Sequence, residues 1–303
     1  MAKKKRALIV VNRLARRGDA DLQPVTASLR GNGIATILIR VGDAEAMNQA
    51  IDVYGSRVDR IVVGGGDGTL DASLHALLDS GLPLGILPLG TANDLARTLR
   101  IPASLSDAAQ IIAAGHIRRI DLGLVNDRYF FNAASIGLAV RVNHCLTPEM
   151  KKKWGVAAYP MALMDAFRNN RPFRVRVVCD GTVHQLKSIQ VTIGNGRHYG
   201  GGMAIRQDAE INDHRLHCYN LKPQTLWELL QTAPSIVKGT FEDRERVWLM
   251  DGSRFEVVTN KPMEIHADGE MKTHTPARFS VQEALLPVFV PPEALEAYPP
   301  EDR

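Results

Sequence analysis

The first 120 residues alternate short, continuous apolar runs with longer segments whose apolar residues recur at helical spacing. Continuous apolar runs predict strands buried on both faces, and helices between such strands predict that the strands run parallel. We therefore expect a doubly wound, parallel α/β sheet. Its predicted strands cover residues 7–11, 36–39, 60–63 and 84–87.

Beyond Gly123 the pattern changes to short, often alternating apolar segments that are separated by Gly, Asn and Asp. Frequent short strands with turn residues between them predict an antiparallel β-sandwich. We expect the two folds to meet near residue 124. The predicted strands of the second fold cover residues 129–131, 173–178, 188–193, 215–219, 254–258, 263–266 and 278–281.

The sequence GGGDGT at residues 64–69 follows a predicted strand directly. Consecutive glycines allow positive φ and close backbone approach, so successive N–H groups can face an anion. The helical pattern that starts at Leu70 would place the positive end of a helix beside a bound phosphate. An ordinary tight turn explains the glycines equally well, because neither GxxxxGK nor GxGxxG fits these residues.

A second segment, PLGTANDLAR at residues 88–97, also joins an apolar strand to a helical pattern. Two strand-to-helix turns that are rich in small polar residues are what a doubly wound sheet needs to enclose a nucleotide. We therefore expect the two turns to form one nucleotide site.

Length and composition narrow the class of protein. A chain of 303 residues predicts two domains, and 45% hydrophobic with 23% charged residues is typical of a globular protein. Three widely spaced cysteines give neither a disulfide framework nor a metal motif, and no apolar run approaches the length of a membrane span. We expect a cytoplasmic protein. The net charge of +4 suits anionic partners, but no nucleic-acid-binding module is present, so nucleic acid is not predicted.

Six motifs in order, GGGDGT, PLGTANDLAR, IDLG, IGNGRHYGGGM, INDHRL and HADGE, resemble the diacylglycerol kinase catalytic-domain family, and most closely the bacterial YegS-like lipid kinases. The resemblance extends from Leu8 to about Pro291. It implies an ATP-dependent lipid kinase whose active site lies in the cleft between an α/β nucleotide-binding domain and a β-sandwich. It also implies that the last segment returns to the first domain, which gives domains of 1–123 with 284–303, and 124–283.

Three carboxylates in the chain are far apart in sequence, and an isolated carboxylate in a turn is usually a solvated cap. The resemblance gives each a role in phosphoryl transfer, which needs a metal and a base. It implies that Glu270 accepts the proton of the acceptor hydroxyl and that Asp121 holds the metal network in place. It also implies Mg²⁺ binding by the side chain of Asp213 and by main-chain oxygens of Glu210 and Arg215.

The same resemblance implies which residues contact ATP. The nucleotide contacts expected are Gly66, Asp67, Gly68, Thr69, Leu70, Asp71, Ala72 and Thr91, with Arg40 near the position of a further contact. The chain departs from the family pattern at Asp71-Ala72, where Asn-Glu is common, and at His214, where Gly is usual. Retuned nucleotide handling is therefore possible, although Asp67, Asp213 and Glu270 are all present.

The acceptor is the least constrained part of the prediction. The segment 151–167 joins a basic cluster to an apolar stretch with Trp154 and Tyr159, which suits either docking at an anionic membrane or a plain packed helix. A diacylglycerol-like, phosphatidylglycerol-like or sphingoid lipid is expected. The alternatives are a soluble hydroxyl acceptor, as in NAD kinases, and a regulatory protein that binds nucleotide without turnover. No zinc site is predicted, because zinc-binding spacing is absent among His144, His214, His217, His266 and His274.

Overall fold

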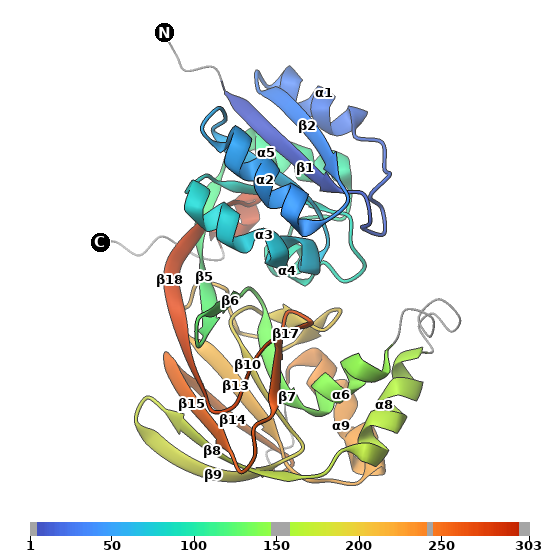
Figure 1. Ribbon diagram of the computed structural model, residues 1–303, viewed down its shortest axis with the longest axis vertical. Coiled ribbons are helices and arrows are strands. Elements are labelled where there is room, and N and C mark those ends of the chain that lie inside the picture. Colours follow the sequence, from blue (N-terminus) through green and yellow to red (C-terminus); the bar gives the residue numbers. More distant parts are fainter. Residues whose placement is uncertain (1–4, 147–157, 241–244, 297–303) are drawn as a thin grey trace. The chain divides into compact units, whose positions relative to one another are not determined.

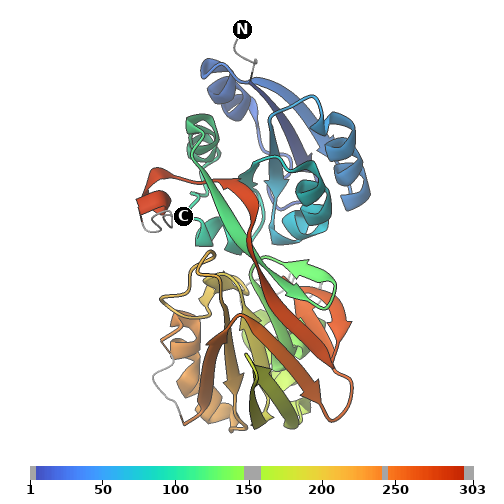
Figure 2. The ribbon, with the colours of Figure 1, turned by 90° about the vertical axis from the view of Figure 1, so that its left-hand side faces the viewer.

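The computed structural model describes residues 5–146, 158–240 and 245–296 (Figure 1). The chain divides into two compact units, with breaks between Asp121 and Leu122 and between Gln282 and Glu283. Both breaks fall within strands, β5 (Ile117–Val125) and β18 (Ala277–Phe289), which pair with one another (Figure 2). The N-terminal unit therefore contains residues from both ends of the chain.

The N-terminal unit is built on a parallel sheet in the order β2-β1-β3-β4, with the end of β18 pairing in parallel beside β4. The strands are β1 (Arg6–Asn12), β2 (Ala35–Val41), β3 (Arg60–Gly65) and β4 (Leu84–Pro88). The apolar runs of β1, β3 and β4 are buried on both faces, as predicted. The same prediction is wrong for β2, whose residues are mostly half-exposed, because β2 is the edge strand of the sheet.

Helices cover both faces of this sheet (Figure 1). The chain moves to one side of β1 to form β2 and then to the other side to form β3, and right-handed crossovers place the two connecting helices on opposite faces. One layer pairs α1 (Gln23–Gly31) with α5 (Leu105–Ala114), and the other pairs α2 (Ala44–Gly55) with α3 (Asp67–Ser80). Two short helices, α4 (Asp94–Thr98) and α10 (Pro292–Glu296), complete the unit. The doubly wound prediction is confirmed.

The C-terminal unit contains an antiparallel sheet in the order β14-β13-β10-β7-β16-β17. These strands are β14 (Val247–Gly252), β13 (Leu216–Leu221), β10 (Gln190–Gly194), β7 (Ala133–Gly137), β16 (Glu264–Ala267) and β17 (Glu270–His274). Facing it are β15 (Arg254–Thr259), β8 (Phe173–Cys179), β9 (Thr182–Ser188), β6 (Arg128–Phe130) and the adjoining parts of β5 and β18. A two-stranded ribbon pairs β11 (His198–Tyr199) with β12 (Met203–Ala204). The predicted sandwich is confirmed.

The sandwich carries a helical layer that the strand pattern did not predict. The strand β10 and the residue before it contribute to two different cores: Val191 and Ile193 pack between the sheets, whereas Ile189, just before β10, belongs to the core that contains the helices. These helices are α6 (Leu138–Cys145), α8 (Ala158–Asn169) and α9 (Leu226–Lys238). The strand β10 is therefore buried on both faces.

The three cysteines are free, as the sequence predicts. Among the residues that the structure describes, no helix is both long enough and apolar enough to span a membrane.

Candidate active site

In the N-terminal unit, polar groups gather where parallel strands end. Strands β1, β3 and β4 run parallel, so their carboxyl ends lie at the same edge of the sheet. The chain leaves neighbouring strands β1 and β3 in opposite directions there, which is the position where open α/β sheets bind ligands. Asn12, at the end of β1, donates from Nδ2 to Oγ1 of Thr69, just after β3, at 3.1 Å.

The two predicted loops meet through their glycines. A Cβ atom on Gly66 would lie 2.9 Å from the Cα of Gly90, and a Cβ on Gly90 would lie 2.4 Å from the Cα of Gly66. Positive φ is not the reason for the glycines, because Gly64, Gly65 and Gly66 all have negative φ or extended backbone. That part of the sequence interpretation is wrong. Gly66 and Gly90 are needed because their two backbones touch, which leaves no space for a side chain between them.

Hydrogen bonds fix the loops further. The backbone N–H of Leu95 donates to Oδ1 of Asp67 at 3.1 Å, so the first residue of α3 caps the start of α4. The side chain of Asn93 accepts from the N–H of Gly90 at 2.9 Å and holds its own loop closed. No role was predicted from the sequence for Asn12 or Asn93. Their position at the ends of predicted parallel strands was the signal that could have found them.

The other predicted nucleotide residues are arranged along the same edge. Thr91 and Ala72 are exposed, whereas the side chain of Leu70 is buried in the core, so only its backbone can face a ligand. Arg40, near the end of β2, donates to the carbonyl oxygens of Gly18 and Ala20. Its guanidinium therefore holds the loop that follows β1.

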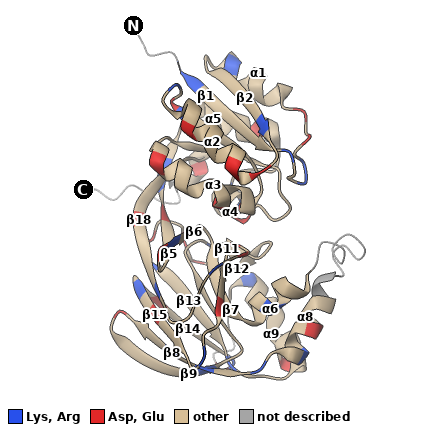
Figure 3. Cartoon of the chain, viewed as in Figure 1, with Lys and Arg blue, Asp and Glu red and all other residues tan. Residues whose placement is uncertain are grey.

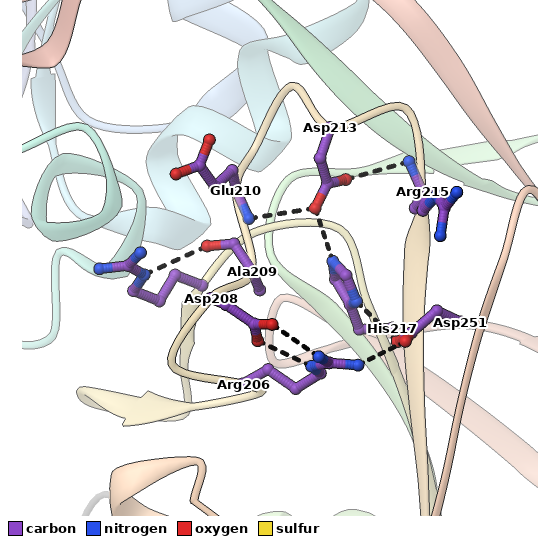
Figure 4. A network of polar contacts seen from close by, with 9 residues as sticks. Arg206, Asp208, Ala209, Glu210, Asp213, Arg215, His217 and Asp251 are labelled. Atoms are coloured by element: carbon purple, nitrogen blue, oxygen red, sulfur yellow. Dashed lines mark hydrogen bonds and ion pairs between the residues drawn. The ribbon is translucent and has the colours of Figure 1, made fainter. Parts of the chain in front are cut away.

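In the C-terminal unit, the predicted metal loop folds around one carboxylate (Figure 4). Oδ2 of Asp213 accepts from the backbone N–H of Glu210 at 3.2 Å, and Oδ1 accepts from the N–H of Arg215 at 3.0 Å. Nε2 of His217 lies 2.8 Å from Oδ2 of the same carboxylate. The structure therefore brings the three predicted metal residues into one loop around Asp213.

His217 links this loop to a second acidic group (Figure 4). It is opposite Asp251 in the β13–β14 register, and its Nδ1 lies 2.8 Å from Oδ1 of that residue. Asp251 in turn pairs with Arg206, which also bonds both oxygens of Asp208 at 2.8 and 2.6 Å. Burial alone would lower the pKa of His217, but its hydrogen bonds to two carboxylates outweigh burial and raise the pKa to about 9.

His217 is therefore a cation at neutral pH, placed between two carboxylates. The sequence analysis considered this histidine only as a zinc ligand and missed the role. The i, i+4 spacing of Asp213 and His217 was a weak signal, and the partner Asp251 is 34 residues away.

The departure at His214 has a visible consequence. Its φ is 58°, in the left-handed region that favours glycine. The usual glycine of the family pattern matches this conformation, and the present chain adopts it with a larger residue.

Glu270 is exposed and begins β17, directly after a two-residue turn. Both turn residues, Asp268 and Gly269, have positive φ, as a tight Asp-Gly hairpin requires. The carboxylate of Asp268 accepts from the backbone N–H groups of Phe131, Asn132 and Ala133 at 2.6, 2.9 and 3.3 Å. The turn that presents Glu270 is therefore anchored to the strand region before β7, a contact that the sequence analysis missed.

Asp121 has a partner within the N-terminal unit. It is buried, and its Oδ1 accepts from the backbone N–H of Ala284 at 2.7 Å. Ala284 has a φ of 46°, so this bond supports β18 at an unfavourable backbone conformation. Asp121 thus ties together the two strands that connect the units.

Family models match both units of the chain. Residues 6–125 match the family described as "Diacylglycerol kinase catalytic domain". Residues 132–290 match the family described as "YegS C-terminal NAD kinase beta sandwich-like domain".

Curated relatives and a crystal structure match most of the chain. A "Diacylglycerol kinase" of Mycobacterium tuberculosis (strain ATCC 25618 / H37Rv) is 30% identical over 273 residues, which is 88% of each chain. A "Probable lipid kinase YegS-like" of Enterobacter sp. (strain 638) is 30% identical over 304 residues, covering 97% of this chain and 98% of the relative. The crystal structure of a "putative diacylglycerol kinase" from Bacillus anthracis str. Sterne superposes with a TM-score of 0.81 at 26% identity, over 96% and 98% of the two chains.

An α/β unit with a glycine-rich loop, followed by a sandwich of this type, therefore defines a lipid kinase that transfers phosphate to an alcohol group. The chain belongs to the diacylglycerol kinase family, in which its C-terminal half is of the YegS type.

Proposed function

We propose that this protein transfers the γ-phosphoryl group of ATP-Mg²⁺ to the hydroxyl of a diacylglycerol-like, phosphatidylglycerol-like or sphingoid lipid, with Glu270 as the general base. The placement of Glu270 carries this proposal most directly. It is an exposed carboxylate at the end of a tight turn, and Asp268 anchors that turn with three backbone hydrogen bonds. A base held in this way keeps its position without being buried.

The residues of the loop 210–215 fit a magnesium ion. Oδ1 of Asp213 accepts a hydrogen bond from the backbone N–H of Arg215, and a carboxylate oxygen has two acceptor positions. Oδ1 of Asn212 is buried without a hydrogen-bond partner among the described residues, and such an oxygen is a ligand type that Mg²⁺ accepts. We assign the ion to Asp213, with main-chain oxygens of Glu210 and Arg215. When bound, Mg²⁺ supplies charge neutralisation of the phosphates.

Within this network, His217 holds the carboxylate of Asp213 in one orientation through Oδ2, so Oδ1 would be the oxygen that binds the ion. In the N-terminal unit, we assign ATP to the loops at residues 66–72 and to Thr91. We also assign Arg40 to the nucleotide site, where it holds the loop that follows β1. We assign Asp121 as a positioning residue.

The acceptor lipid implies contact with a membrane, and α9 offers a surface for it. Trp227, Leu230, Pro234 and Val237 recur at i, i+3, i+7 and i+10, which places them on one face of the helix. Trp227 is 69% exposed, and Leu230 and Val237 are both 49% exposed. Leu229 and Ile236, on another face, pack into the core.

Helix α8 also exposes apolar side chains, Met161 and Met164, which are both more than 40% exposed, and α8 and α9 carry few charged residues (Figure 3). We propose that these exposed apolar residues enter the interface of a lipid bilayer. The basic cluster at 151–153 and Trp154, which the sequence analysis proposed for the same purpose, lie outside the described residues.

The membrane contact is tested with vesicles that contain anionic lipid. Trp227→Gln should weaken partitioning about tenfold, because burying one large apolar side chain is worth more than 1.4 kcal/mol. Val53→Gln changes an apolar residue of α2 that is 56% exposed and should have no effect. Equal partitioning of the Trp227→Gln protein and the unaltered protein would overturn this surface assignment.

The reaction is tested by transfer of labelled γ-phosphate from ATP-Mg²⁺ into a total bacterial lipid extract. Glu270→Gln should lower turnover about 10²- to 10⁴-fold with ATP binding and thermal stability unchanged, since the residue is exposed. Asp67→Asn should also lose activity, whereas Glu293→Gln, an exposed glutamate of α10, should not.

The labelled product identifies the acceptor. Label in lipid that persists in the Glu270→Gln protein would remove Glu270 as the base. Bound ATP without labelled lipid would favour a soluble hydroxyl acceptor, and no product with any acceptor would favour nucleotide binding in a regulatory role.

A further inference from the structure

Three side chains with metal-ligating atoms meet in the C-terminal unit, away from the acidic loop. Nε2 of His144 lies 2.8 Å from Oε2 of Glu264, and Nε2 of His266 lies 3.3 Å from the same oxygen. The three ligating atoms all lie within 4.8 Å of one another. We call these residues the His144 cluster.

The topology explains why residues 120 positions apart come together. In β16, Ile265 and Ala267 face the core between the sheets, so Glu264 and His266 point to the other face. A register shift between Ile265 and His266 marks a bulge, a feature that re-aims side chains. Helix α6 follows β7, the neighbour of β16, and carries His144 in its last turn to the same face.

The geometry is close to that of a tetrahedral metal site. Two imidazoles and one carboxylate are a ligand set found for zinc with an open fourth position. With metal–ligand bonds near 2.1 Å, neighbouring ligand atoms of a tetrahedron lie about 3.4 Å apart. Two of the observed separations are 2.8 and 3.3 Å and the third is within 4.8 Å, so each pair lies within about 1.5 Å of the tetrahedral value. The two rings stand edge to face, with centroids 5.2 Å apart.

A second observation concerns the buried ring. The side chain of His266 is only 9% exposed, and its Nδ1 is buried without a hydrogen-bond partner among the described residues. Its other ring nitrogen, Nε2, faces Oε2 of Glu264, so the ring enters the cluster through that atom. His144 is 58% exposed, so an ion can reach the cluster from solvent.

We propose that the His144 cluster binds a transition-metal ion of the zinc class, with His144, Glu264 and His266 as ligands and water in the fourth position. The ion links the end of α6 to β16. Because β16 leads directly into the Asp268-Gly269 turn, a bound ion also stiffens the hairpin that presents Glu270. The ligand binding does not depend on the proposed kinase reaction.

The test uses the full chain, from which metal is first removed by chelation. The protein is then titrated with Co²⁺ in the presence of excess Mg²⁺, because Mg²⁺ occupies the sites made of oxygen ligands. Tetrahedral Co²⁺ has strong visible absorption, and Zn²⁺ should abolish that signal by displacement. Glu264→Gln and His144→Ala should each weaken Co²⁺ binding about 100-fold or more, since loss of an outer partner alone can cost 10- to 100-fold. Both residues are substantially exposed, so both variants should fold.

Two controls make the result decisive. His116→Ala removes an exposed imidazole outside the cluster and should leave the spectrum unchanged. Asp213→Asn should also leave it unchanged. Equal binding by the unaltered protein and the cluster variants would overturn the proposal, as would a Co²⁺ signal that disappears only in Asp213→Asn. A weak, octahedral type of Co²⁺ spectrum in the unaltered protein would overturn it as well.

Discussion

The glycine loops of the N-terminal unit and the acidic network of the C-terminal unit hold their polar groups by different forces. In the first, Gly66 and Gly90 bring two backbones into contact, and hydrogen bonds within and between the loops hold them there. In the second, a cationic His217 bridges the carboxylate of Asp213, in the loop before β13, and that of Asp251 on β14. The stability of the glycine loops should therefore fall when a side-chain atom is added. The stability of the acidic network should fall when a charge is removed.

The largest expected effect is loss of the bridging cation. His217→Asn leaves Asp213 and Asp251 facing one another without a positive group between them. Breaking a buried ion pair costs 3–5 kcal/mol, and both carboxylates are about a quarter exposed, so we expect a loss of about 2–3 kcal/mol. Urea unfolding measures this. His116→Asn, at an exposed site, should cost under about 0.5 kcal/mol, and equal losses in the two variants would refute the bridging role.

The anchor of the Glu270 turn should be nearly as sensitive. Asp268→Ala removes the acceptor of three backbone N–H groups, and we expect a loss of about 2 kcal/mol in unfolding free energy. Asp268→Asn keeps an acceptor oxygen and tolerates the left-handed φ, so its loss should be less than half as large. Lipid phosphorylation should fall in the same order. Identical stabilities of the two variants would show that the carboxylate does not anchor the turn.

The glycine loops give the contrasting case, in which the addition of one methyl group should lower stability. Gly66→Ala places a Cβ against the backbone of Gly90 and should cost about 1–3 kcal/mol, with weaker ATP binding. Gly68→Ala meets nothing within 4 Å and lies in the first turn of α3. It should stabilise the unit by up to about 1 kcal/mol. Calorimetric melting separates the two, and a stable Gly66→Ala protein would contradict the role assigned to backbone contact.

The smallest expected effect is at His214. Glycine adopts its φ of 58° without steric cost, but glycine also loses more chain entropy on folding. We therefore expect His214→Gly to raise stability by no more than about 1 kcal/mol. A substantial decrease would mean that the histidine side chain itself stabilises the loop.

Much of the fold was predictable because it depends on local patterns. The continuous apolar runs that form β1, β3 and β4 and the glycines that follow β3 stand next to one another in the chain. Parallel strands then place their ends at one edge, so the meeting of the two loops also follows from the sequence. The edge position of β2 and the helical layer over the sandwich could not be predicted from these patterns. The first depends on which strand has a neighbour on one side only, and the second depends on which face of a sheet is covered by helices.

The sequence by itself determined the two folds, their order and the family, and it placed Asp67, Asp213 and Glu270 in recognisable motifs. Only the tertiary structure decided which side chains support them. His217 with Asp251, Asp268 with the strand region before β7, and His144 with Glu264 are each brought together from 34 to 137 residues apart. Antiparallel pairing and helix packing set these contacts. No local sequence pattern predicts them, because the energy of a buried charge or a shared carboxylate depends on partners that are distant in the chain.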